Sequence, residues 1–203
     1  LMTLSANVSS SSYVLTVLHV FSRGNLYNGS QIDFSVDLRR LAGFVLKNYV
    51  FCGHTIQIFE RLQSYIKPEL LSALRDPYED IQKTSAILLA KIASSFIFAY
   101  WSDILISLVS NLTAEPSSID AIRGSIMALE GIVEDCPEKI CMEVSILCTI
   151  LQTLLLYCGH SIENIQLSSI RGFNTLLYHI HCAKDNAETS LLDILVSNYL
   201  NRL

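Results

Sequence analysis

The sequence predicts an all-α fold, a superhelical solenoid in which antiparallel helix pairs stack side by side. Three observations predict it. One segment recurs four times along the 203 residues, each copy has the apolar periodicity of an α-helix, and the chain contains only 8 Gly and 4 Pro. The composition, 51% hydrophobic and 16% charged, also excludes an intrinsically disordered chain, which would contain few large apolar residues.

The recurring segment begins with Asp or Asn in every copy. The copies read DLRRLAGFVLKNYV from Asp37, DIQKTSAILLAKIA from Asp80, DAIRGSIMALEGIV from Asp120 and NIQLSSIRGFNTLL from Asn164. Their starts are 43, 40 and 44 residues apart, and a period of about 40–47 residues is typical of HEAT and armadillo repeats. Since Asp and Asn side chains cap the free N–H groups at helix starts, we expect each copy to begin a helix capped by that residue.

Each copy also has one apolar face with a small residue at its centre. The sixth position is small in all four copies: Ala42, Ser85, Ser125 and Ser169. The second, tenth and thirteenth positions hold Ala121 and otherwise large apolar or aromatic residues: Leu38, Leu46, Tyr49, Ile81, Leu89, Ile92, Leu129, Ile132, Ile165, Phe173 and Leu176. The second, sixth, tenth and thirteenth positions are four, four and three residues apart, so they share one face of a helix. The small residue predicts that a neighbouring helix approaches closely.

The segments between the copies predict the partner of each helix. We name the helix of each copy the B helix and the helix before it the A helix. A helices are predicted at residues 13–21, 56–74, 101–112 and 142–157, with 191–203 opening a further repeat. Turns are predicted at Asp76-Pro77, Glu115-Pro116, Cys136-Pro137 and Gly159. Pro68 falls inside a predicted A helix, where we expect a kink or a break.

Two segments are predicted to lack helix. Residues 24–35 are polar and rich in Gly and Asn, which predicts a long loop or insertion. Residues 1–12, which include a run of four Ser, are predicted to be a frayed end or a loop. The predicted organisation is a single HEAT-repeat array over residues 1–203, with B helices starting near 37, 80, 120 and 164. We expect it to be a fragment of a longer solenoid.

Charge and cysteine content restrict the class of partner. The formal net charge is −5, which counts against unspecific binding to nucleic acid or anionic lipid but is compatible with a basic protein partner. The longest nearly uncharged stretch, Val144–Tyr157, is too short to cross a bilayer, so no membrane insertion is expected. The six cysteines lie mostly in apolar helical stretches, which predicts reduced core thiols and an intracellular protein.

The sequence contains no recognisable catalytic or metal-binding motif. Cys-Gly-His occurs at residues 52–54 and 158–160, but without the paired spacings of zinc ligands. Signatures of nucleophilic serine, nucleotide or dinucleotide sites are also missing. We therefore expect no enzyme activity, no cofactor and no metal. Carboxylates gather in two groups, which are either solvated caps and turns or an acidic contact surface for a basic partner: Asp76, Glu79 and Asp80, then Glu130, Glu134, Asp135 and Glu138.

Residues 38–135 resemble the importin-β, or karyopherin-β, family of nuclear transport receptors, and transportins most closely. The resemblance rests on LAGFVLKNYV at 41–50, AILLAKIASS at 86–95, the helix start at Trp101 and MALEGIVEDC at 127–136, which follow each other in the family's order. The chain departs from the family at Ser102, where Pro is usual, and at Asn48, the one Asn kept of a usual pair. Trp101 itself is predicted to pack in the core with Ile104 and Leu105.

The resemblance implies an early part of a long solenoid whose B helices line a concave side that binds the small GTPase Ran with GTP. It also implies outward-facing A helices that bind Phe-Gly nucleoporins, cargo sites further along the chain, and a protein that shuttles between cytoplasm and nucleus. Polar positions outside the core face of the B helices are the candidate Ran-facing residues: Arg39, Arg40, Lys47, Asn48, Gln82, Lys83, Lys91, Arg123, Glu130, Gln166 and Asn174.

The alternative is a HEAT-repeat scaffold or adaptor for protein assembly unrelated to nuclear transport, such as a phosphatase or ubiquitin-ligase regulator. It would have the same repeat and the same acidic charge. The helix ends at Lys47-Asn48 and Glu134-Asp135 favour the transport receptor. A helical enzyme would need a convergent polar cluster that the sequence does not contain.

Overall fold

A computed structural model of the chain describes residues 2–22, 34–51, 56–95, 102–113 and 118–184. All regular structure in these ranges is α-helical, which confirms the predicted all-α class of paired helices. The helices are α1 (Met2–Ser22), α2 (Val36–Phe51), α3 (Ile56–Ala73), α4 (Glu79–Ser95), α5 (Ser102–Thr113), α6 (Ile119–Asp135), α7 (Pro137–Met142), α8 (Val144–Tyr157) and α9 (Glu163–Lys184). No helix of the described ranges is long and apolar enough to cross a membrane.

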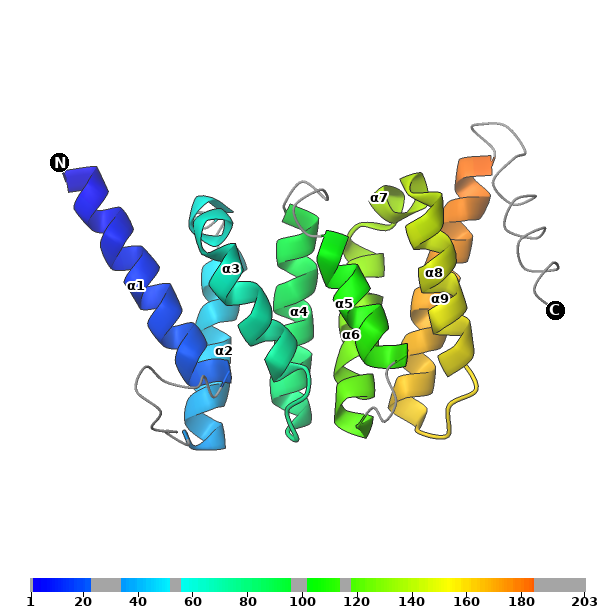
Figure 1. Cartoon of the computed structure of the whole chain (residues 1–203), viewed down its shortest axis with the longest axis horizontal. Helices are drawn as coiled ribbons and strands as arrows, with labels where there is room; N and C mark the ends of the chain where they lie inside the picture. Colours follow the sequence, from blue (N-terminus) through cyan, green and yellow to red (C-terminus); the bar gives the residue numbers. More distant parts are fainter. Residues whose placement is uncertain (1, 23–33, 52–55, 96–101, 114–117, 185–203) are drawn as a thin grey trace.

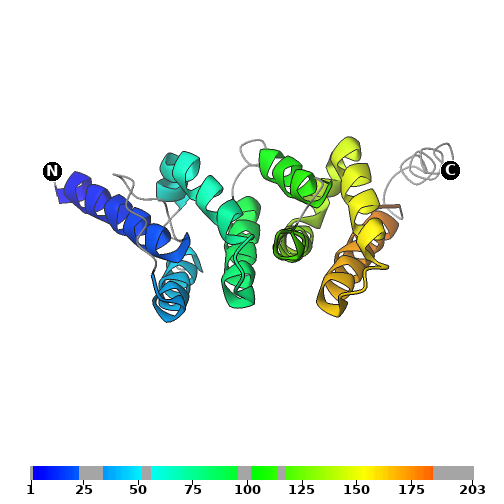
Figure 2. The ribbon, with the colours of Figure 1, turned by 60° about the horizontal axis from the view of Figure 1, so that its bottom comes forward.

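The helices form two layers that run along one axis (Figures 1 and 2). The A layer consists of α1, α3, α5 and α8, and the B layer of α2, α4, α6 and α9. In the B layer α4 packs between α2 and α6, and α6 packs between α4 and α9. Each pair therefore packs mainly against the next pair, as in a solenoid.

Polar contacts also join successive A helices. Ser22 Oγ of α1 donates a hydrogen bond to the Glu69 carboxylate of α3, and Lys67 of α3 pairs with Asp103 of α5. The Tyr157 hydroxyl of α8 donates to the Leu112 carbonyl of α5 at 2.7 Å. The A layer is thus linked from α1 to α8 by side chains as well as by apolar packing.

The B helices begin one residue before the predicted positions, so the expected N-cap residues are wrong. In α6 the cap is Ser118, whose Oγ accepts from the Ala121 N–H at 3.1 Å. Before α2, Ser35 Oγ accepts from the Leu38 N–H at 3.4 Å. Asp37, Asp80 and Asp120 lie in the first turns instead. There the positive end of the helix dipole stabilises a carboxylate, which explains why acidic residues recur at this position.

The predicted apolar face of the B helices forms the core. Ser85, Ser125 and Ser169 are completely buried, and Ala42 nearly so. Two of these serines donate hydrogen bonds to the backbone: Ser85 Oγ to the Leu70 carbonyl at 2.7 Å and Ser169 Oγ to the Ile165 carbonyl at 2.8 Å. Ile104 and Leu105 are buried as expected.

Leu38 is the exception on this face, because its side chain is 43% exposed whereas the neighbouring Arg39 is completely buried. Arg39 pairs with Asp76 in the turn between α3 and α4. Its Nε also donates to the Phe21 carbonyl at 3.0 Å. A guanidinium that loses its water needs such partners. These contacts join α2 to α1 and to the turn between α3 and α4.

The structure differs from the local predictions at three places. Residues 2–12 are part of α1 rather than a frayed end, because Ser disfavours a helix by only about 0.5 kcal/mol per residue and α1 packs on α2 and α3. Pro68 does not break α3, although the helix changes direction along its length in Figure 1. The short α7 was not predicted; Pro137 occupies its first turn, where a missing N–H is harmless.

Several predictions fall outside the described residues. They concern most of the loop at 24–35, the Cys-Gly-His triplet at 52–54, Trp101, the turn at Glu115-Pro116 and the helix at 191–203. The turns at Asp76-Pro77 and at Gly159 are present.

Candidate functional site: a groove across the B helices

The B layer has a groove that crosses α4, α6 and α9 and has a volume of about 500 Å³. Its floor is apolar: Ala86, Ile87 and Ala90 come from α4, Met127 from α6 and Leu167 from α9. Phe51, at the end of α2, closes one side. Charged side chains also line the groove, so it offers both apolar contact area and charged groups.

The repeat itself explains why these residues meet. The eighth position of the copies holds Phe44, Ile87, Met127 and Arg171, and the last three line the groove. This position lies two residues after the small core position, so it points away from the core face. Stacking the B helices side by side places the same position of successive repeats in a row.

A glycine permits close packing behind this row. A Cβ on Gly124 of α6 would lie 2.0 Å from the Leu74 carbonyl oxygen, just after α3. Any side chain at this position would collide with backbone. The contact holds α6 against the turn that follows α3, in the preceding repeat, and Met127 lies about one turn further along α6.

The charges of the groove are unevenly distributed. Glu79, Glu130, Glu134 and Asp135 line it together with Lys83, Lys91 and Arg171. Glu130 and Arg171 form an ion pair at 3.7 Å, and Lys91 Nζ lies 5.6 Å from the centre of the Phe51 ring. Partial burial raises the pKa of Glu134, and the neighbouring Glu130 raises it further. Negative charge is therefore concentrated at the C-terminal end of α6.

The structure brings three of the eleven predicted partner-facing residues into the groove: Lys83, Lys91 and Glu130. Five others lie on B helices outside it: Arg40, Lys47, Asn48, Arg123 and Asn174. Arg40 pairs with Asp37 and Asp80, and Arg123 with Asp120.

The remaining three have structural contacts. Arg39 and Gln82 are completely buried, so neither side chain is on the surface where a partner would bind. Gln82 Nε2 donates to the Asp76 carbonyl, and Gln166 Nε2 donates to the Cys158 carbonyl at 3.0 Å. Gln82 and Gln166 occupy the same repeat position, and each ties a B helix to the turn before it.

Sequence reasoning missed most of the groove. It selected polar residues and so passed over Phe51, Ile87 and Met127; Arg171 and Asn164 were missed as well. The available signal was the eighth position, which is apolar in three copies although it lies off the core face.

The described residues include no group of three or more side chains placed to hold a metal ion. The five described cysteines are free thiols: Cys136, Cys141, Cys148, Cys158 and Cys182. Burial raises the pKa of Cys136 to about 11, so this thiol stays protonated and is a poor nucleophile at neutral pH.

No protein-family model matches the chain. A segment of 107 residues, 51% of the chain, is 32% identical to a transportin of Dictyostelium discoideum. Half of the chain is thus distantly homologous to a transportin. This finding confirms the resemblance predicted from the matching stretches of the sequence. The chain spans about 11% of the length of that transportin, so the similarity concerns one region of a much longer protein.

Proposed function

We propose that the chain is a region of a nuclear transport receptor of the importin-β type, and that its B-helix face binds Ran in the GTP-bound form. The observation that carries the proposal is the 32% identity to a transportin over 107 residues. The groove across α4, α6 and α9 supports it, because it offers a partner protein an apolar floor with charges of both signs. Such a surface suits protein recognition, where apolar contact gives affinity and charge gives specificity.

The proposed mechanism uses the flexibility of a solenoid. Because each helix pair packs mainly on the next, small rotations between pairs add up to a change of curvature. Binding of Ran-GTP across several B helices would select one curvature and thereby release cargo bound elsewhere on the receptor. Phe-Gly nucleoporins would bind between the outward-facing A helices, and the receptor would move between cytoplasm and nucleus.

Titration calorimetry of the purified chain with Ran, loaded with a GTP analogue or with GDP, tests this proposal. We expect binding to the GTP form and at least tenfold weaker binding to the GDP form, a difference of about 1.4 kcal/mol. No binding to either form by the folded chain would contradict the proposal and favour a HEAT scaffold unrelated to nuclear transport.

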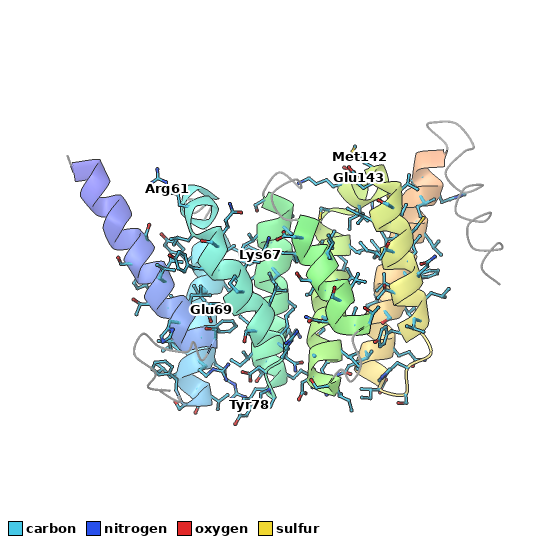
Figure 3. The ribbon with its side chains drawn as sticks, in the orientation of Figure 1. Arg61, Lys67, Glu69, Tyr78, Met142 and Glu143 are labelled. Atoms are coloured by element: carbon cyan, nitrogen blue, oxygen red, sulfur yellow. The ribbon has the colours of Figure 1, made fainter. Side chains whose placement is uncertain are left out.

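A pair of matched variants tests whether the B-helix face is the surface that binds Ran-GTP. Lys83→Glu reverses an exposed charge in the groove on α4, and Arg61→Glu makes the same change on α3 in the A layer (Figure 3). We expect Lys83→Glu to weaken Ran-GTP binding about tenfold and Arg61→Glu to leave it within twofold. Equal effects of the two substitutions would show that the B-helix face is not the binding surface. Arg39 is unsuited to this test because its burial couples it to folding.

A further inference from the structure

The solvent-facing side of α3, in the A layer, contains a serine between two cations. Ser64 is exposed and the following Tyr65 is 58% exposed, so the chain around the Ser64 hydroxyl is accessible from solvent. Arg61 lies three residues before Ser64 and Lys67 three residues after it. Because residues three apart are neighbours on the surface of a helix, both cations flank the hydroxyl. The segment 61–67, RLQSYIK, contains no acidic residue, so a phosphate on Ser64 would lie between two positive charges.

The spacing of Arg61 and Ser64 is a pattern that one class of protein kinase recognises. These serine kinases bind an Arg three residues before the acceptor in an acidic groove of the enzyme. Among all Ser and Thr residues of the sequence, only Ser64 has Arg at this distance. Ser94 has Lys91 there instead, but its hydroxyl is part-buried and donates to the Lys91 carbonyl at 3.0 Å. Charge pattern and exposure therefore select the same serine.

Pro68 weakens α3 at Ser64. In an α-helix the carbonyl of each residue accepts a hydrogen bond from the N–H four residues later. Pro68 is four residues after Ser64 and has no N–H, so the Ser64 carbonyl lacks this bond within α3. A kinase binds its acceptor segment in an extended form, and a helix that already lacks a hydrogen bond opens at lower cost. The position of Pro68 therefore favours access to the Ser64 hydroxyl.

Lys67 also connects α3 to α5. From the second half of α3 (Figure 3), its Nζ pairs with the Asp103 carboxylate in the first turn of α5. The Asp103 side chain is 62% exposed, so this pair is partly screened by water. A phosphoserine has a charge of about −1.5 to −2 at neutral pH and three strong acceptor oxygens. A phosphate on Ser64 would therefore compete with Asp103 for Lys67.

We propose that Ser64, made accessible by Pro68, is a phosphorylation site for a serine kinase that selects Arg three residues before the acceptor, and that the phosphate draws Lys67 away from Asp103. The kinase transfers the γ-phosphoryl group of ATP to Ser64 Oγ. The new O–P bond forms as the bond to the β-phosphate oxygen breaks, the hydroxyl proton passes to the kinase, and ADP leaves. The modification loosens the A layer between α3 and α5, and it does not depend on the proposed function.

Incubation of the whole chain with ATP and an activated calmodulin-dependent protein kinase that selects Arg at this position tests the site. Mass spectrometry is expected to find phosphate on Ser64. Arg61→Ala is expected to slow its incorporation at least about tenfold, whereas Arg40→Ala, which removes a half-exposed Arg of α2, leaves the rate within about twofold. Phosphate on Ser94 in place of Ser64, no phosphate on the folded chain, or equal rates for the two variants would overturn the proposal.

A second pair of variants tests the role of the proline. Pro68→Ala keeps the Arg61 and Ser64 spacing but supplies the missing N–H, so we expect phosphate incorporation at least about threefold slower. Pro137→Ala, in the first turn of α7, is the matched control and is expected to leave the rate within about twofold. An unchanged or faster rate for Pro68→Ala would contradict access through the opening of α3.

Hydrogen exchange measured by mass spectrometry tests the effect on α5. Phosphorylation is expected to speed amide exchange in the first turns of α5 about threefold and to leave α8 unchanged. Lys67→Gln removes the cation that the phosphate attracts, so phosphorylation of this variant should not change exchange in α5. Unchanged exchange in α5 of the phosphorylated wild-type chain, or an equal change in the Lys67→Gln variant, would contradict the role of Lys67. Because Ran takes no part in these experiments, their failure and that of the proposed function can be told apart.

Discussion

The buried pair of Arg39 and Asp76 shows how much one residue can depend on a distant partner. The two side chains are separated by 37 positions in sequence and are both inaccessible to water. Since an isolated charge in the interior is unfavourable, each side chain stabilises the fold only while the other is present. The pair joins α2 to the turn between α3 and α4, so it holds successive repeats together.

We predict that Arg39→Ala destabilises the chain by about 3–5 kcal/mol, because Asp76 would remain buried without its cation. Arg40→Ala is the matched control: Arg40 is the next residue, is half exposed and pairs with Asp37 and Asp80 at the surface. We expect it to change the free energy of unfolding by about 0–1 kcal/mol. Urea denaturation followed by circular dichroism gives both values. A similar small effect for the two substitutions would contradict the importance of the buried pair.

Whereas the Arg39–Asp76 pair stabilises the fold through its charges, the charged form of Glu134 destabilises it. Its raised pKa means that the folded chain holds the proton more tightly than the unfolded chain does. The group therefore contributes most to stability when protonated, and this contribution is lost as pH rises through its folded pKa. The charged groups that share its groove are Glu130 and Asp135 on α6, Glu79, Lys83 and Lys91 on α4, and Arg171 on α9.

We accordingly predict that Glu134→Gln raises the melting temperature at pH 7 by about 1 °C, the size expected for relief of like-charge contacts on a helix. The gain should disappear near pH 4, where the wild-type carboxyl is protonated. Differential scanning fluorimetry at both pH values checks the sign. A lower melting temperature at pH 7 would mean that the charge of Glu134 is compensated within the chain.

At the scale of elements, the fit of α6 against its neighbours depends on the absence of a side chain. Gly124 faces the Leu74 carbonyl oxygen, and a Cβ would have to displace backbone rather than a flexible side chain. The other glycine worth comparing is Gly159, in the turn between α8 and α9, where a Cβ would meet nothing within 4 Å.

We predict that Gly124→Ala destabilises the chain by about 1–3 kcal/mol, in spite of the better helix propensity of Ala, because α6 must shift away from the Leu74 carbonyl. Gly159→Ala is expected to be neutral or to stabilise by about 0.4–1 kcal/mol through the unfolded state. Chemical denaturation measures both changes. A stabilised Gly124→Ala variant would show that helix propensity outweighs the packing of α6.

At the scale of the whole molecule, the groove belongs to no single repeat. It needs α4, α6 and α9 side by side, with Phe51 from α2 at one end. A change in the angle between helix pairs would therefore alter the spacing between its carboxylates and its apolar floor. This relation would let the curvature of the solenoid and the binding of a partner influence each other.

The sequence alone determined the helix-pair architecture and the core face of the B helices. Periodicity is a property of a single helix, so Ser85, Ser125 and Ser169 could be placed in the interior without knowledge of their neighbours. The repeat distance likewise placed each B helix within one residue of its observed start. Half of the chain also contains enough of the transportin pattern to be related to that family from residues alone.

Only the tertiary structure decided which polar side chains reach the surface. Arg39 is buried and Leu38 is exposed because Asp76 and the Phe21 carbonyl lie beside α2, and neither contact follows from the pattern of α2 itself. The groove likewise arises where three repeats meet, so the placement of Ile87 of α4 and Leu167 of α9 beside the carboxylates of α6 could not be predicted from one copy. The periodicity of a helix determines which of its faces is buried. Contacts with residues distant in sequence determine which charged side chains remain exposed and can contact a partner.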